Sequence, residues 1–239
     1  MNRSVDARHL SAQLRALSDV EAAKQQQRFF KTGPGDYAEG DRFLGIKVPV
    51  LRALAKQYRS SGLDEVTGLL VSEYHEERLF ALLLLMQFYR QGKARDRAAA
   101  YELYFEQVRH INNWDLVDVS APHIVGHYLS DKPRDRLYEL AGSASLWERR
   151  IAIVATFHFI RQNEFDDTLR LAAQLCTDRH DLMQKAVGWM LREVGKRDQA
   201  IEEAFLLPRY RSLPRTLLRY AIERFPEPLR QRYLSGTLG

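Results

Sequence analysis

The chain has 239 residues, of which 45% are hydrophobic, with a formal net charge of +5 and a single cysteine. This length and composition allow a full buried core, and one cysteine excludes both a disulfide framework and a thiolate metal site. The longest apolar run, within residues 79–86, is far shorter than the roughly 20 residues that a membrane helix needs. The N-terminal segment lacks the pattern of a secretory signal, so we expect a cytoplasmic protein.

The chain reads as helical over nearly its whole length. From His9 onward, apolar residues recur at every third or fourth position, and the short breaks fall at glycine or proline. The exception is residues 29–49, which hold four glycines and two prolines between aromatic ends. We interpret this segment as a long turn, or a small hairpin, that joins the first helix to one beginning near Val48.

Five predicted helices resemble one another: ERLFALLLL, NWDLVDVSA, WERRIAIVA, MQKAVGWML and LLRYAIERF. Alignment places one small apolar residue of each at an equivalent position, and these anchors recur with a period of roughly 35 residues. Such a period predicts an all-α fold, an α-α superhelix (solenoid) of HEAT-like helical pairs, in a single domain spanning residues 1–239. The alternative is an irregular helical bundle with accidental periodicity. The anchors are Ala81, Val117, Ala152, Val187 and Ala221.

Four unusual residues fall on neighbouring sectors of these helices. With the anchor as origin and a turn of about 100° per residue, Trp114 lies at about 60° and Asp118 at about 100°. On the next two repeats, Arg150 lies at about 160° and Trp189 at about 200°. In a curved repeat protein the inner helices line a concave surface, so we expect these side chains to converge there. The alternatives are core tryptophans and a structural ion pair between Asp118 and Arg150.

Basic residues occupy the same arc. Five cations from successive repeats fall between about 60° and about 160° on this helical wheel, and a sixth lies near the first repeat. A concave basic groove suits the phosphate backbone of a nucleic acid, whereas the alternative for each cation is a solvated helix face. The candidate DNA contacts are Arg78, Arg149, Lys185, Arg192, Arg219 and Lys47.

The sequence offers little for other chemistries. Ser120 and His123 could form a nucleophile and base, but no third group orients the histidine. His123 and His127 have a metal-like spacing without a third ligand, so we expect no metal and no cofactor. What remains is the carboxylate of Asp118 between aromatic walls in a basic groove. A carboxylate placed in this way stabilises a positively charged sugar while indole faces hold a cationic base, which suits cleavage of an N-glycosidic bond.

The stretches FLGIKVPVLR, NNWDLVD, LWERRIAIVATF and MQKAVGWMLREVGK resemble the AlkD-type DNA glycosylases, HEAT-like proteins that excise alkylated purines. The resemblance covers roughly residues 43–199. It implies that Asp118 is the catalytic carboxylate, that Trp114 and Trp189 surround the lesion nucleotide, and that Arg150 is the cation beside the acid. It further implies a monomeric, cofactor-free enzyme associated with the nucleoid. This enzyme would hydrolyse 3-methyladenine and 7-methylguanine from duplex DNA.

Two departures from that family keep other functions open. The loop TGPGDYAEGD looks longer than in well-known members, and relatives with a hairpin inserted nearby bind branched DNA with little or no glycosylase activity. Asn113 stands where an active relative has a second tryptophan. One alternative is therefore a DNA-structure-binding protein with a silent site. The other is a HEAT scaffold for a protein partner, which predicts an apolar or acidic concave face. No lysine lies in the central cluster, so we do not expect strand cleavage through a Schiff base.

Overall fold

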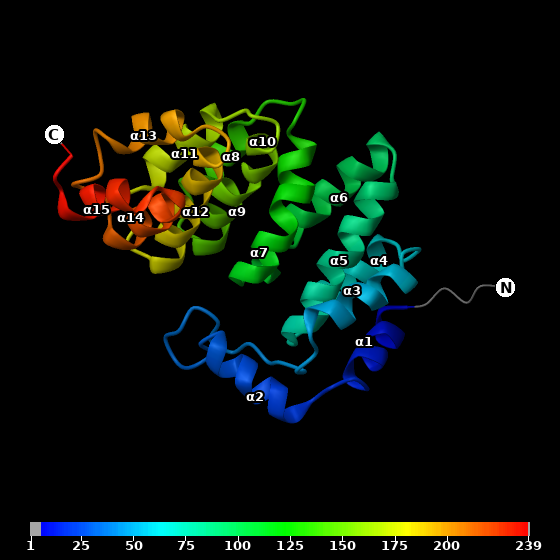
Figure 1. The fold of residues 1–239 in the computed structure, drawn as a ribbon. Coiled ribbons are helices and arrows are strands. Elements are labelled where there is room, and N and C mark those ends of the chain that lie inside the picture. The colour runs from blue at the N-terminus through cyan, green and yellow to red at the C-terminus, as the bar shows by residue number, and fades with distance from the viewer. Residues whose placement is uncertain (1–5, 239) are drawn as a thin grey trace. The chain divides into compact units, whose positions relative to one another are not determined.

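The computed structural model describes residues 6–238, and the regular structure in that part of the chain is helical (Figure 1). A single isolated bridge, between Arg42 and Tyr74, is the one β-type contact among these residues. The prediction of an all-α fold is confirmed. The chain divides into two compact units, residues 1–120 (unit 1) and residues 121–239 (unit 2). The single domain over residues 1–239 stays a prediction.

Unit 1 is built around one long helix, α5 (His75–Gln91), which packs against α3, α4 and α6. Its residues 75–85 are all buried. Residues 79–85 are apolar around the helix, whereas the four polar residues before them are buried with hydrogen-bond or ion-pair partners. The expected helix start near Val48 is confirmed as the first residue of α3. The other elements of this unit are α1 (Ala7–Arg15), α2 (Val20–Phe29), α3 (Val48–Gln57), α4 (Leu63–Leu70), α6 (Ala94–Glu106), η1 (Val108–His110) and α7 (Trp114–Ala121).

Residues 30–47, between α2 and α3, form turns and extended chain rather than a hairpin. The carboxylate of Glu76 accepts hydrogen bonds from the backbone N–H groups of Leu44 (2.8 Å), Gly45 (2.8 Å) and Ile46 (3.2 Å). Gly45 has a φ of +83°, and a Cβ added there would lie 2.1 Å from the backbone oxygen of Asp19. This position therefore needs glycine, and the buried Glu76 fixes the segment against the start of α5.

Unit 2 has a comparable centre in α12 (Asp181–Gly195), which packs against α9, α11, α13 and α14. Gly188 allows the close contact with α14, because a Cβ there would lie 2.5 Å from the Leu217 carbonyl oxygen. The chain passes Pro122 through a π-helical segment, which accommodates the missing N–H of the proline. The other elements are η2 (Pro122–Gly126), α8 (Asp135–Ala141), α9 (Leu146–Ala155), α10 (Phe157–Ile160), α11 (Asp166–Leu175), α13 (Gln199–Leu206), α14 (Arg215–Ala221), η3 (Ile222–Arg224) and α15 (Glu227–Ser235).

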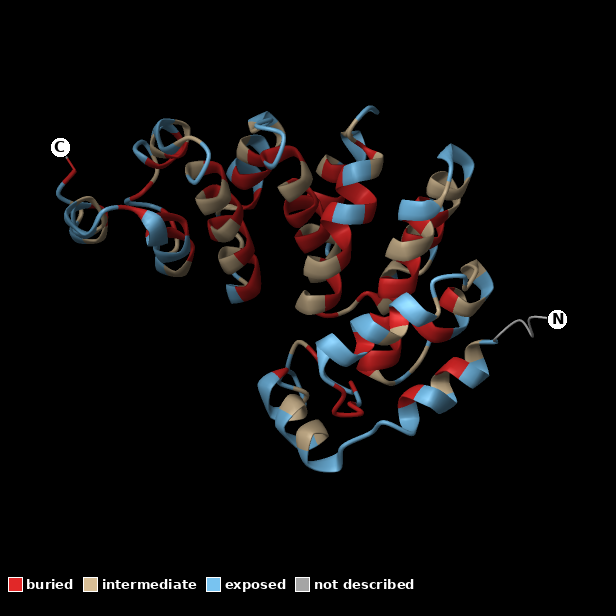
Figure 2. Cartoon of the chain, turned by 45° about the vertical axis from the view of Figure 1, so that its right-hand side comes forward, coloured by how far each residue is buried: buried red, intermediate tan, exposed pale blue. Residues whose placement is uncertain are grey.

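The repeat predicted from the sequence is visible in the burial pattern. All five anchors are 0% exposed, and they lie on α5, α7, α9, α12 and α14. Buried residues follow the helix faces turned toward neighbouring helices of the same unit, while the outer turns are exposed (Figure 2). A common fully buried position in five helices argues against accidental periodicity. Within the described residues, every helix is too short or too polar to cross a membrane.

Candidate nucleic-acid interface

Trp114 is the first residue of α7 and is half-buried among aromatic side chains of unit 1. Its ring stacks on Phe30, with centroids 5.4 Å apart and planes 23° apart, and it meets the edge of Phe29 at 6.0 Å. Phe30 in turn stacks on Phe43 at 5.0 Å. Trp114 is thus fixed by side chains from the end of α2 and from residues 30–47, the turn segment, which lie far earlier in the sequence.

An ionic network lies directly beneath this aromatic cluster. His75 Nε2 is 2.8 Å from the Asp115 carboxylate, and its Nδ1 is 3.6 Å from Asp41. The guanidinium of Arg78 donates to Asp41 at 2.7 Å and to the Ser72 carbonyl at 2.9 Å. Phe30 and Phe43 also pack against the His75 ring, at 5.0 and 4.7 Å. The network therefore joins the turn segment, α5 and the first turn of α7.

The charges in this network balance in pairs. Burial by itself lowers the pKa of His75, but Asp115 and Asp41 outweigh it and raise that pKa to about 9. Burial would raise the pKa of Asp41, yet His75 and Arg78 hold it below its ordinary value. At neutral pH two cations face two carboxylates, which is the arrangement that makes buried charge tolerable.

Asp118 lies one helical turn after Trp114 on α7 and is half-buried. The hydroxyl of Tyr104, which is fully buried, lies 3.0 Å from Ser120 Oγ. Burial raises the pKa of the Tyr104 hydroxyl above its ordinary range, and the negative charge of Asp118 raises it further. The carboxylate of Asp118 thus lies within electrostatic reach of a neutral phenol that stays protonated. Trp114 and Asp118 belong to one short helix, as the repeat alignment predicted.

Arg150 and Trp189 belong to unit 2. Arg150 is only 5% exposed, and its Nη1 donates to the Leu182 carbonyl of α12 at 2.6 Å. Trp189 is half-buried, its indole N–H donates to Glu193 at 3.1 Å, and its ring lies 5.8 Å from that of Phe157. The convergence of these two residues with Trp114 and Asp118 stays a prediction.

The six predicted DNA contacts have unequal settings. Arg78 differs most from expectation, because it is 3% exposed and engaged with Asp41. We therefore assign it to the buried network and not to the interface. Three others form ion pairs: Arg149 with Asp178, Lys185 with Asp181, and Arg192 with Glu223. Arg219 and Lys47 are exposed.

Sequence reasoning missed His75, Asp41 and Phe30. Asp115 also belongs to this group, because its Oδ1 accepts from the Leu116 N–H and its Oδ2 pairs with His75. None of these contacts follows helical periodicity. The density of aromatic and acidic residues in the turn segment was the one available signal.

Three histidines of unit 2 are neighbours: His123, His127 and His158. His123 and His127 are exposed, and the ring of His127 lies 5.1 Å from that of His158. Burial and the neighbouring histidines lower the pKa of His158 to about 4. Across the described part of the chain, no three His, Cys, Asp or Glu side chains are grouped to hold a metal ion.

Comparison with known proteins agrees with this architecture. A family model for DNA alkylation repair enzymes matches residues 10–225. A solved structure, described as a predicted DNA alkylation repair enzyme from Enterococcus faecalis, superposes with a TM-score of 0.66 over 88% of this chain and 97% of that one. The two sequences are 18% identical, so this likeness shows the fold alone. No curated protein matches the chain significantly.

The fold and the family model together define the class of protein. The match spans most of the chain, so the chain belongs to the family of DNA alkylation repair enzymes. Membership supports a role in DNA repair, with DNA as the partner.

Proposed function

We propose that this protein is a monofunctional DNA glycosylase that hydrolyses the N-glycosidic bond of cationic alkylated purines, 3-methyladenine and 7-methylguanine, in duplex DNA. The proposal rests on the arrangement of two side chains on α7. This helix presents a half-buried tryptophan and, one turn later, a half-buried carboxylate, on a first turn fixed by Phe30 and His75. An aromatic and an acid side by side suit a cationic base attached to a sugar that becomes positive.

The proposed reaction breaks the bond between C1′ and the purine N9. The alkylated base already carries a positive charge, so it leaves as a neutral base with the bonding electron pair and needs no proton. Asp118 stabilises the positive charge that develops on the sugar and accepts a proton from the water that bonds to C1′. The half-buried indole of Trp114 holds the cationic base through its electron-rich face. These steps require only side chains of the protein and water.

Trp189 and Arg150, which both belong to unit 2, have supporting roles in this proposal. Trp189 supplies a second aromatic wall, held by its hydrogen bond to Glu193. Arg150 supplies positive charge by its electrostatic field and not by direct contact with DNA, because its guanidinium is buried and donates to the Leu182 carbonyl. Among the predicted cations, the exposed Arg219 and Lys47 are the most available to phosphate. We propose that the protein acts as a monomer on duplex DNA, in the cytoplasm at the nucleoid.

A second candidate is a protein that binds branched DNA and has a silent site. It is favoured by the turn segment before α3, which lies against Trp114 and follows Phe29 at the end of α2, an aromatic residue that is 66% exposed. An exposed aromatic residue beside a nucleic-acid interface can insert between base steps and prefer distorted DNA.

One experiment separates the two candidates. Methylated duplex DNA, unmodified duplex and an unmodified four-way junction are each incubated with the protein, and released bases and bound DNA are measured. The glycosylase proposal predicts release of 3-methyladenine and 7-methylguanine from the methylated duplex. No release, together with tighter binding to the junction than to plain duplex, would instead establish the second candidate.

A further inference from the structure

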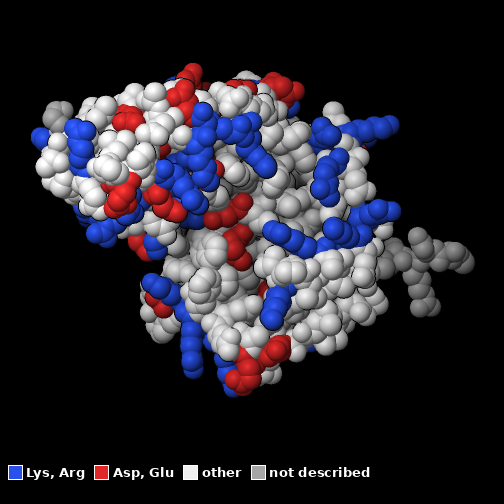
Figure 3. All heavy atoms as spheres, viewed as in Figure 1, with Lys and Arg blue, Asp and Glu red and all other residues white. Residues whose placement is uncertain are grey.

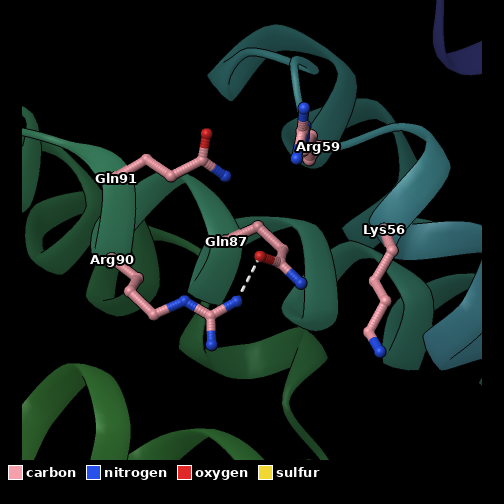
Figure 4. A pocket seen from close by; sticks show the side chains of 5 residues that line it. All are labelled: Lys56, Arg59, Gln87, Arg90 and Gln91. Carbon is pink, nitrogen blue, oxygen red and sulfur yellow. Dashed lines mark hydrogen bonds between the residues drawn. The ribbon is translucent and has the colours of Figure 1, made fainter.

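A pocket of about 350 Å³ lies at the C-terminal ends of α3 and α5 in unit 1 (Figure 4). None of the side chains that line it is acidic, three are cationic and two are amides. In this view Gln87 lies between Arg90 and Lys56, and Arg90 donates to the Gln87 side-chain oxygen. The lining residues are Lys56, Arg59, Gln87, Arg90 and Gln91.

The charge of this pocket is strongly positive. Lys56, Arg59 and Arg90 are all exposed, and among the described residues none of the three is in a salt bridge with a carboxylate. Two helix C-termini nearby each contribute about −0.5 elementary charge, which leaves a net charge of about +2. Over α3 to α6, the visible face of unit 1 carries lysine and arginine side chains and few acidic ones (Figure 3).

The pocket is separate from the predicted catalytic residues. On α5, Arg90 lies fifteen residues after His75, the residue that fixes the start of α7. At about 1.5 Å per residue, the two positions are roughly 22 Å apart along the helix. Arg52, one turn before Lys56 on α3, extends the basic surface beyond the pocket and is also exposed. The basic surface that runs from the pocket to Arg52 is therefore larger than one small anion.

We propose that this pocket binds a backbone phosphate of the DNA, as a contact site remote from the base that reacts. Lys56, Arg59 and Arg90 surround the phosphate, and the amides of Gln87 and Gln91 donate to its oxygens. The chemistry fits, because phosphate oxygens accept from guanidinium, ammonium and amide groups alike. The inference rests on the proposed function for its choice of DNA, since free phosphate presents the same chemical group.

The test is the salt dependence of duplex binding by the full chain. The variant combines Lys56→Gln, Arg59→Gln and Arg90→Gln, and the control combines Arg179→Gln, Arg197→Gln and Arg232→Gln. All six residues are exposed, and both variants lose three positive charges. One phosphate contact contributes about 0.9 to the slope of log K against log salt. We expect the pocket variant to bind more weakly, by about tenfold at low salt, with a slope that is smaller in magnitude by about one. An equal change of slope in the control would overturn the assignment.

Two further measurements distinguish this proposal from the glycosylase proposal and from binding of free phosphate. Base release is measured in single turnover with protein in saturating excess, where the pocket variant should match the wild type. If the wild type releases no base but the slopes still differ, the glycosylase proposal fails and the pocket assignment stands. Melting temperature is also followed in inorganic phosphate against chloride. Stabilisation of the wild type by phosphate, lost in the pocket variant while the DNA slopes stay equal, would assign the pocket to free phosphate and overturn the DNA contact.

Discussion

The two tryptophans proposed to surround the lesion are held in different ways. Trp114 is fixed by residues far away in the sequence, through Phe30 of the turn segment and the network of His75 and Asp115. Trp189 is fixed mainly within its own helix, by a hydrogen bond to Glu193 four residues later. The first arrangement joins separate segments of unit 1, whereas the second needs helix α12 and one ring contact, with Phe157 of α10. The difference predicts that substitutions around Trp114 are far more costly than those around Trp189.

The largest expected effect follows from Asp41→Ala. This change leaves the buried cations Arg78 and His75 with one carboxylate between them. Breaking a buried ion pair by removing one partner costs about 3–5 kcal/mol. We therefore expect a loss of that size in the free energy of unfolding of unit 1, measured by urea titration with hydrogen exchange to separate the two units. A loss below about 1 kcal/mol would show that the network is not a stabilising feature.

The second effect is a dependence of stability on pH. The pKa of His75 in the folded protein is about 9, above the ordinary value of 6.5. The folded state therefore binds more protons than the unfolded state between these values, so this stabilisation is fully present below about pH 6.5 and is lost as pH rises to about 9. Hydrogen exchange in unit 1 at pH 6.5, 7.5 and 9 should show this loss, and His75→Gln should flatten it. An unchanged profile in the variant would contradict the assignment.

His158 of unit 2 gives stability a pH dependence of the opposite sign. Its pKa is lowered to about 4, so the folded state binds fewer protons than the unfolded state between about pH 4 and 6.5. The contribution of His158 to stability therefore increases as pH rises from about 4 to about 6.5, and it is lost as pH falls through that range.

The smallest effect is expected for Glu193→Ala. This substitution removes the acceptor for the Trp189 indole and the partner of Lys196, the residue that caps the end of α12. Such contacts contribute about 0.5–1.5 kcal/mol at most. Urea titration should therefore show a loss of about 1 kcal/mol or less in the free energy of unfolding. A loss comparable to that of Asp41→Ala would remove the distinction between the two tryptophans.

Much of the fold could be predicted from the sequence, because it depends on local periodicity. The alignment of the repeats identified the five anchors, and all five are fully buried. The helical wheel predicted that Arg78 points toward the groove, but it did not predict that Arg78 is buried. A wheel angle says nothing about which distant segment covers that face, and the carboxylate that covers it, Asp41, is 37 positions earlier.

The candidate site was predictable only in part, for the same reason. Trp114 and Asp118 share a helix, so their spacing is local and visible in the sequence. The ring that stacks on Trp114 belongs to Phe30, in the distant turn segment, and the neighbouring contact of His75 with Asp115 joins residues 40 positions apart. Neither contact leaves a periodic signal in the sequence. Residues 29–49 could be recognised as turns from their glycines and prolines, whereas their role in fixing α7 emerged only from the folded structure.

The central claim is that Asp118 is the catalytic carboxylate, and single-turnover release of 7-methylguanine from duplex DNA tests it most directly. Wild type and Asp118→Asn are compared with protein in saturating excess, and duplex affinity is measured in parallel. Loss of one electrostatic group aimed at the transition state costs about 10²–10³ in rate. We expect a decrease of at least that size with duplex affinity unchanged. Equal rates for the two proteins would contradict it.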